Sequence, residues 1–222
     1  MKYGIIGAGA MGYRYGVMLQ ENAGVDVDFI DTWEPNVEKV REQGGVSVAR
    51  DHKNRRIIPI NMYYPEEYTG HPDVWIIFKK QMQLAEELER DSKAGIFHDD
   101  QYVFSAMNGM GHFEKIEKYF PKDHIVCGTA MIATRLDGPA NVDFMGPVNS
   151  EVMHMAPYNN KPADETMQAI FNDFTAAKMG PVMVDEWKGM CMSKVVFNAV
   201  TNTLCTMYEM QMGQFIEYEG VT

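Results

Sequence analysis

The sequence has few cysteines, few basic side chains and no long apolar run, and each shortage excludes a class of protein. The three cysteines are odd in number and show no C-x-x-C spacing, so neither a disulfide framework nor a zinc knuckle is expected. The 20 lysines and arginines face 31 aspartates and glutamates, and the net charge of -11 disfavours binding to a nucleic-acid backbone. No stretch of 18 apolar residues occurs, and the first residues lack the apolar core of a signal peptide. We therefore expect a cytoplasmic protein that binds neither nucleic acid nor membranes.

The six histidines are scattered without the spacing of metal ligands, so no metal site is expected. Hydrophobic residues make up 45% of the chain, which is enough for a packed core. Short apolar stretches alternate with segments of helical periodicity, a pattern typical of an α/β fold with a parallel, doubly wound sheet. The strands are expected at residues 3–6, 25–30, 73–78, 102–106 and 182–184, with an edge or hairpin strand at 55–63 around Pro59, and the helices at 10–20, 36–43, 81–91, 111–119 and 163–178.

A different pattern begins near the C-terminal end of the sequence. From Glu186 to about Met212, the residues read as one long helix with little punctuation. We place a domain boundary near Asp185. This division gives a Rossmann-type dinucleotide-binding domain at 1–185 and the first part of an all-helical substrate or dimerisation domain at 186–222.

The residues that follow the first strand match the pattern G-x-G-x-x-G and open a helix. The glycines of this motif permit a tight turn, close approach of a pyrophosphate, and close packing of the helix on the strand. The helix N-terminus adds N–H donors and a partial positive charge, both favourable to a phosphate. The sequence therefore predicts a dinucleotide cofactor bound by Gly7, Ala8, Gly9, Ala10, Met11 and Gly12.

An acidic residue, Asp31, ends the second strand, 19 residues after Gly12. A carboxylate at this position can accept hydrogen bonds from the adenosine ribose of NAD, and its charge repels the 2′-phosphate of NADP. Glu34 adds to that repulsion. Alternatively, Asp31 caps the turn at residues 32–34. We expect NAD, bound as NADH for reduction, to be the cofactor.

In the last helix Lys194, Asn198 and Asn202 recur every four residues and therefore share one face. Their neighbours are mostly apolar, and burying a lysine and two amides without partners is costly. The stripe therefore indicates a binding site, in which the lysine could donate a proton to a carbonyl oxygen. A solvated helix face is the alternative interpretation.

Four motifs in order make the chain resemble the ketopantoate reductase family over nearly its whole length. They are Lys80 within FKKQMQ, the Asn-Gly-Met-Gly turn at 108–111, the segment from Gly-Thr to Arg-Leu-Asp-Gly at 128–138, and K-x-x-x-N-x-x-x-N within 187–202. The resemblance implies hydride transfer at the 2-carbon of a small 2-oxo or 2-hydroxy acid. It gives the site residues these roles: Lys194 as general acid/base, Asn108 between nicotinamide and substrate, Asn198 and Asn202 on the substrate, Lys80 on the cofactor, and Thr134 lining the cofactor through its backbone.

Two departures from the family pattern bear on the substrate. Asp31 stands where the family usually has a basic residue suited to NADPH, and Met212-Gly213 stands where Asn-Gly is frequent. Both favour a resemblance to the NAD-dependent D-mandelate dehydrogenases, which are D-2-hydroxyacid dehydrogenases that interconvert D-mandelate and benzoylformate. The alternatives are an NADPH-dependent 2-dehydropantoate 2-reductase and, from another class, a non-catalytic NAD-binding regulator. Lys194 argues against the regulator.

Members of the family are longer than this chain, so we expect a C-terminally truncated protein with weak turnover. An unfinished helical domain would expose apolar residues such as Phe215 and Ile216. Exposed apolar surface favours association, and the sequence therefore predicts a homodimer.

Overall fold

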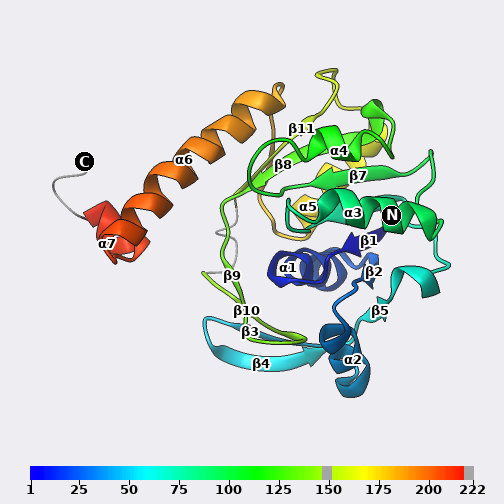
Figure 1. Ribbon diagram of the computed structural model, residues 1–222, viewed down its shortest axis with the longest axis horizontal. Coiled ribbons are helices and arrows are strands. Elements are labelled where there is room, and N and C mark those ends of the chain that lie inside the picture. The colour runs from blue at the N-terminus through cyan, green and yellow to red at the C-terminus, as the bar shows by residue number, and fades with distance from the viewer. Residues whose placement is uncertain (147–151, 218–222) are drawn as a thin grey trace.

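The computed structural model describes residues 1–146 and 152–217, whose strands form two sheets. Helix α1 (Ala10–Met18) lies between them (Figure 1) and contacts both. The larger sheet contains, in spatial order, β12 (Pro181–Met183), β11 (Met153–Pro157), β8 (Ile125–Ala130), β7 (Tyr102–Ser105), β6 (Val74–Ile77), β1 (Lys2–Ile6), β2 (Asp26–Ile30) and β5 (Asn61–Tyr63).

The six strands from β8 to β5 run parallel, which confirms the predicted parallel, doubly wound α/β fold. Strand β11 pairs antiparallel with β8, and β12 runs parallel to β11. The chain builds β1, β2 and β5 outward in one direction and then returns to add β6 on the other side of β1. In such sheets ligands bind outside the carboxyl ends of the strands at this reversal. The carboxyl ends of β1 and β6 therefore mark the expected ligand position.

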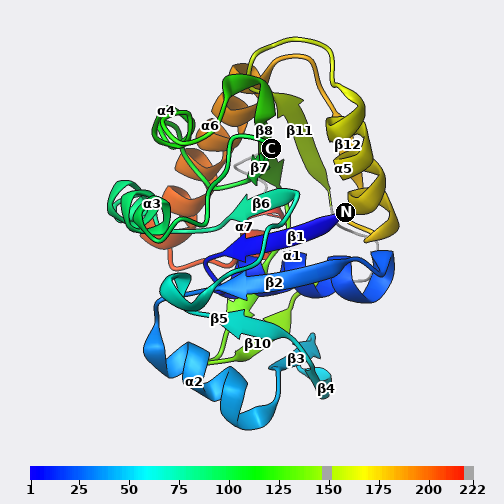
Figure 2. The ribbon, with the colours of Figure 1, turned by 90° about the vertical axis from the view of Figure 1, so that its right-hand side faces the viewer.

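Helices cover both faces of the larger sheet (Figure 2). One cluster of buried apolar side chains joins α1 and α5 to the sheet, and a second joins α3, α4 and the start of α6 to its other face. Strand β6 is buried along its whole length, as its unbroken apolar run predicts. The remaining helices are α2 (Glu34–Gln43), α3 (Leu84–Lys93), α4 (Phe113–Ile116), α5 (Glu165–Ala176), α6 (Trp187–Met207) and α7 (Met212–Glu217), with short turns η1 (Leu19–Ala23), η2 (Pro65–Glu67) and η3 (Lys122–His124).

The smaller sheet contains β4 (Lys53–Ile58), β3 (Val46–Arg50), β10 (Asn141–Phe144) and β9 (Thr134–Leu136) in that order. The sequence analysis did not predict β3. The segment expected as one strand at 55–63 is divided at Pro59. Before it, β4 forms a hairpin with β3; after it, β5 lies at the edge of the larger sheet. Proline lacks the N–H that a sheet ladder needs, so the chain changes sheets there.

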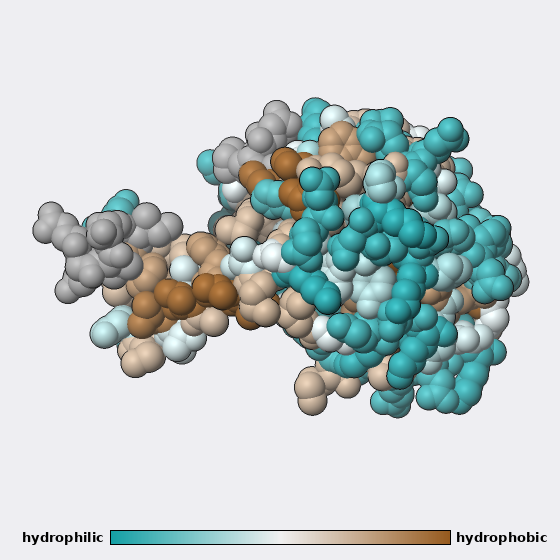
Figure 3. All heavy atoms as spheres, turned by 90° about the horizontal axis from the view of Figure 1, so that it is seen from above, coloured by the Kyte–Doolittle hydropathy of each residue, from teal (hydrophilic) through white to brown (hydrophobic). Residues whose placement is uncertain are grey.

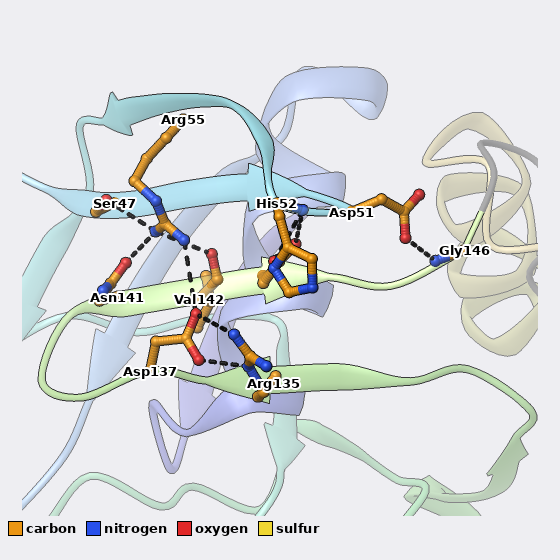
Figure 4. Close-up of polar contacts among 10 residues, drawn as sticks. Ser47, Asp51, His52, Arg55, Arg135, Asp137, Asn141, Val142 and Gly146 are labelled. Atoms are coloured by element: carbon orange, nitrogen blue, oxygen red, sulfur yellow. Dashed lines mark hydrogen bonds and ion pairs between the residues drawn. The ribbon is translucent and has the colours of Figure 1, made fainter. Parts of the chain in front are cut away.

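Polar side chains tie the smaller sheet together (Figure 4). Arg55 donates to Ser47 Oγ at 3.2 Å, to Asn141 and to the carbonyl of Val142 at 3.4 Å. Within the Arg-Leu-Asp-Gly motif, Arg135 pairs with Asp137 at the end of β9. In this structure the motif therefore stabilises the hairpin of β9 and β10 in the smaller sheet.

Two helices differ from their expected lengths. Helix α4 covers only 113–116 of the expected 111–119, because Gly111 has φ 90° and lies outside the right-handed helical region. Helix α6 ends at Met207, before the expected Met212, and Glu209 beyond it has φ 52°.

Helix α6 begins where Glu186 accepts hydrogen bonds from the backbone N–H groups of Lys188 and Gly189. Its first turns bury Trp187 and Cys191, and the rest of the helix extends away from the sheet (Figure 1). The division of the chain at Asp185 stays a prediction. Within residues 1–146 and 152–217, no helical segment has the length and apolar character that a membrane crossing needs.

Candidate active site

The glycine-rich loop after β1 has the close packing that its motif predicts. Gly7 has φ 95°, and a Cβ there would lie 2.4 Å from the carbonyl oxygen of Phe78. A Cβ at Gly12 would lie 2.0 Å from the carbonyl oxygen of Gly7. A Cβ at Gly9 would meet no atom of the described residues within 4 Å. Gly7 and Gly12 are therefore required by the fold, whereas Gly9 leaves open space at the helix N-terminus.

The N-terminus of α1 is free to bind an anion. Gly9 is the N-cap, no side chain of residues 1–146 or 152–217 caps the helix, and its first turn contains no acidic residue. The first helical hydrogen bond runs from the N–H of Tyr13 to the carbonyl of Gly9, so the N–H groups of Ala10, Met11 and Gly12 have no partner within the helix. This cradle fits the pyrophosphate of a dinucleotide.

The carboxylate of Asp31 is already engaged by the protein. Its Oδ2 accepts hydrogen bonds from Ala8 N at 2.9 Å and Asn36 Nδ2 at 3.2 Å. Its Oδ1 accepts from Thr32 N at 2.7 Å and Trp33 N at 3.2 Å. The turn cap considered as an alternative for Asp31 is thus present, and the same carboxylate also fastens the glycine-rich loop to β2. Ribose binding by Asp31 stays a prediction.

Lys79 lies two residues after the end of β6. The sequence analysis did not name it as a site residue. Its Nζ lies 3.5 Å from Asp31 Oδ1 and 3.2 Å from Glu87 Oε2, and all three side chains are largely buried. Its Cδ would lie 3.0 Å from a Cβ on Gly7, so the lysine stem packs on the glycine-rich loop. Lys80, expected on the cofactor, is exposed. The adjacent residues Lys79 and Lys80 therefore have different environments. Lys79 packs on the glycine-rich loop, and Lys80 is exposed to solvent.

The turn after β7, which contains Asn108, contacts the polar stripe of α6. Asn108 Oδ1 accepts a hydrogen bond from Asn198 Nδ2 at 3.4 Å. Asn108 is exposed at the carboxyl end of β7, and Gly109 follows it with φ 96°. Two of the expected site residues, 90 positions apart in sequence, are thereby brought together.

The polar stripe of α6 is only partly buried. Lys194 Nζ lies 2.9 Å from Met131 Sδ and 5.6 Å from the centre of the Phe197 ring. Burial lowers the pKa of Lys194 below its usual value of 10.5. Asn202, one turn beyond Asn198, is exposed. The interpretation as a solvated face therefore fits Asn202, whereas Lys194 is half-buried.

Thr134 lies apart from this stripe, at the start of β9. Its Oγ1 accepts a hydrogen bond from Arg14 at 3.3 Å, and Arg14 also donates to the carbonyls of Ala133 at 2.6 Å and Met145 at 3.1 Å. Arg14 is fully buried and lies 5.1 Å from the centre of the Phe144 ring. The fold thus uses Thr134 to join α1 to the smaller sheet, and its contact with a cofactor stays a prediction.

Among the described residues of the two C-terminal helices, the exposed apolar surface lies on α6 and not on α7, where it was expected. Phe215 is buried, with 5% of its surface exposed, so the expectation that it is exposed was wrong. The side chain of Ile216 lies outside the described residues. The exposed hydrophobic surface lies instead along α6 (Figure 3), at Met192, Val196, Phe197, Val200 and Met207. The homodimer stays a prediction.

Comparison with known proteins identifies the family. The model of the family "Ketopantoate reductase PanE/ApbA" matches residues 3–158. A curated relative, the 2-dehydropantoate 2-reductase of Streptococcus pyogenes serotype M6, is 30% identical over 97% of this chain and 67% of its own length. The chain thus spans about two thirds of the length of that relative.

Solved structures agree with this assignment. A putative 2-dehydropantoate 2-reductase from Enterococcus faecalis superposes on the whole chain with a TM-score of 0.76 and 27% identity, over 69% of its own length. A D-mandelate dehydrogenase, solved with NADH and anilino(oxo)acetate, gives a TM-score of 0.85 and 27% identity over the whole chain and 69% of its own length.

These findings correct the substrate expected from the sequence. Curated relatives from Streptococcus pyogenes and Lactococcus lactis are 2-dehydropantoate 2-reductases, and D-mandelate dehydrogenase is matched as a structural neighbour. The expectation of D-mandelate and benzoylformate was therefore wrong. It rested partly on Met212 as a residue of the long helix, but α6 ends at Met207 and Met212 begins α7. With the family model matching most of the chain and a relative aligned over nearly all of it, the chain belongs to the ketopantoate reductase family.

Proposed function

We propose that this protein is a 2-dehydropantoate 2-reductase, which reduces the 2-oxo group of its substrate to a hydroxyl. The observation that carries the proposal is the contact between Asn108 and Asn198. It brings the Lys194 face of α6 to the carboxyl end of β7, at the sheet edge where the glycine-rich loop also lies. A reducible carbonyl between these groups would meet a proton donor on one side and the dinucleotide cradle on the other.

The residues of the chain have separable roles in this reaction. A reduced nicotinamide, when bound, would supply the hydride to the 2-carbon. Lys194 would donate its Nζ proton to the carbonyl oxygen, and its lowered pKa makes that donation easier. Asn108 would orient the carbonyl, while Asn198 and Asn202 would hold the acid group.

We infer that the cofactor is NADH. Asp31, after β2, and Glu87, on α3, place two largely buried carboxylates beside one lysine, Lys79. This local excess of negative charge disfavours a 2′-phosphate. Asp31 acts here through charge and through its hold on the loop, since both of its oxygens already accept hydrogen bonds.

Titration of the protein with NADH and with NADPH, followed by nicotinamide fluorescence, tests the cofactor. We expect NADH to bind at least about tenfold more tightly, a difference of about 1.4 kcal/mol. Steady-state reduction of 2-dehydropantoate and of benzoylformate, each with the tighter cofactor, then tests the substrate. Reduction of benzoylformate alone would refute the proposed substrate, and tighter binding of NADPH would refute the inference on the cofactor.

The two glycines of the loop allow binding to be separated from folding. Gly9→Val adds a side chain in open space, so the free energy of unfolding should stay near the wild-type value while the dinucleotide Kd rises at least about tenfold. Gly12→Val places atoms against the backbone of Gly7 and should destabilise the fold by about 1–3 kcal/mol or more. Urea unfolding and cofactor titration of both variants check this. Unchanged binding in Gly9→Val would show that the dinucleotide lies elsewhere.

A further inference from the structure

A single amide holds the turn that carries Asn108. Gln81, between β6 and α3, places its Nε2 3.1 Å from the carbonyl oxygen of Asn108 and 3.1 Å from that of Met110. The same nitrogen lies 2.9 Å from the position a Cβ would take on Gly109. The amide therefore occupies the inside of the turn and satisfies the two carbonyls on either side of Gly109.

A buried histidine adds to this arrangement. His112 is fully buried, and its Nδ1 lies 3.4 Å from Gln81 Nε2, the longest of the three contacts of that nitrogen. An imidazole nitrogen accepts a hydrogen bond only when it is unprotonated, so the contact requires the neutral ring. Burial, with a smaller effect of Lys115, lowers the pKa of His112 to about 4, which keeps the ring neutral at physiological pH.

The backbone of Gln81 is fixed from the other side. Lys115 Nζ, from α4, donates to the carbonyl oxygen of Gln81 at 2.9 Å. Thus Gln81 is held by α4 and in turn holds the Asn108 turn, whose glycines at 109 and 111 both have positive φ. A turn with two such glycines has much conformational freedom of its own, and it needs an external constraint to keep one geometry.

We propose that Gln81 is a positioning residue of the reductase, which sets the place of Asn108 against Asn198 through its two bonds to the turn. This inference rests on the proposed function, because Asn108 matters to turnover only if the carbonyl is reduced there. The side-chain amide of Gln81 contacts backbone carbonyls of the turn and not the side chains of Asn108 or Lys194, so it acts through the backbone of the turn. A misplacement of the order of 1 Å at such a residue is enough to lower a reaction rate by up to about 100-fold.

Gln81→Met keeps the length of the side chain and removes the donor, so it is the direct test. We expect the backbone order parameters of residues 108–111 to fall from about 0.85, typical of rigid backbone, to below about 0.6. We expect kcat to fall about tenfold to 100-fold while the dinucleotide Kd stays within about twofold. Gln81→Glu, which presents an acceptor to the same carbonyls, should lower kcat at least as much.

Gln20→Met is the matched control. Gln20 Nε2 also donates to a backbone carbonyl, that of Pro59 at 2.8 Å, but it lies on η1, at the opposite end of the helix that begins at the glycine-rich loop. The Gln20→Met variant should have the wild-type backbone order parameters at residues 108–111 and the wild-type kcat.

The outcomes separate the two proposals. Rigid 108–111 backbone in Gln81→Met would overturn the positioning role, whether or not the protein turns over. Mobile backbone with wild-type kcat would also overturn it, since the turn would then not govern the reaction. A wild-type protein that binds no dinucleotide or reduces no 2-oxo acid would refute the proposed function, while the order parameters would still decide whether Gln81 fixes the turn.

Discussion

Replacing Lys194 with methionine is expected to lower kcat for reduction of the 2-oxo acid by about 100-fold to 10,000-fold. Methionine keeps an apolar stem in the space between Met131 and Phe197, so α6 should be undisturbed. Within residues 1–146 and 152–217, Lys194 Nζ forms no ion pair with a carboxylate, and its polar contact is with Met131 Sδ. Removing this nitrogen removes the donor to the carbonyl oxygen.

The pH dependence of kcat strengthens this test. Burial lowers the pKa of Lys194, so the wild-type rate should decline toward alkaline pH, beginning below the usual lysine value of 10.5. The variant should lack that decline. Dinucleotide titration should give the same Kd in both proteins.

Lys188→Met is the control for Lys194→Met. Lys188 lies in the first turn of the same helix, and its Nζ is also 5.6 Å from an aromatic ring, that of Trp187. It is exposed and off the polar stripe, so kcat should stay near the wild-type value. If Lys194→Met retained kcat within about threefold, a difference of only about 0.7 kcal/mol, another group would have to donate the proton.

The second large effect is expected in the stability of the fold at acid pH. Burial of His112 lowers its pKa from 6.5 to about 4, with a smaller effect of Lys115 in the same direction. Between these two pH values the unfolded chain binds a proton that the folded chain does not. The stabilisation is therefore fully present above pH 6.5 and is lost as the pH falls toward 4. A depression of this size corresponds to about 3 kcal/mol.

His112→Gln should remove this part of the pH dependence. We expect the free energy of unfolding, from urea titrations at several pH values between 7 and 4, to fall less steeply in the variant than in the wild type. The variant will be less stable at pH 7, because His112 packs 3.9 Å from the Phe113 ring, so the slope and not the absolute value is the measurement. Equal slopes in wild type and His112→Gln would contradict the lowered pKa.

The local features of the sequence were sufficient for the order of the main elements. An unbroken apolar run identifies β6, and the glycine spacing after β1 identifies the tight turn into α1, because each feature reflects contacts between near neighbours in the chain. Of the smaller sheet, the strand expected at 55–63 covers part of β4, whereas β3 was not predicted. Strand β3 pairs with β4 in a hairpin on one side and with β10, about 95 residues away in sequence, on the other, and the parallel pairing with β10 has no local signal.

In the candidate site too, some features could be predicted from local spacing and others depend on tertiary contacts. The period of 3.6 residues places Lys194, Asn198 and Asn202 on one helix face, so the stripe could be predicted from spacing alone. The sequence could not show that Asn198 meets Asn108, or that Lys79 turns toward Asp31 while its neighbour Lys80 faces solvent. Both contacts depend on how the loops after β6 and β7 cross the edge of the sheet.

The sequence by itself determined the type of fold, the glycine-rich loop after the first strand and the polar face of the last helix, because these follow from periodicity and glycine placement. Only the tertiary structure decided what each polar group binds. It assigned the oxygens of Asp31 to the protein's own donors, and it placed Gln81 and His112 behind the Asn108 turn. The physical reason is that a buried hydrogen bond requires two groups at about 3 Å, and folding can take those groups from any two positions in the chain.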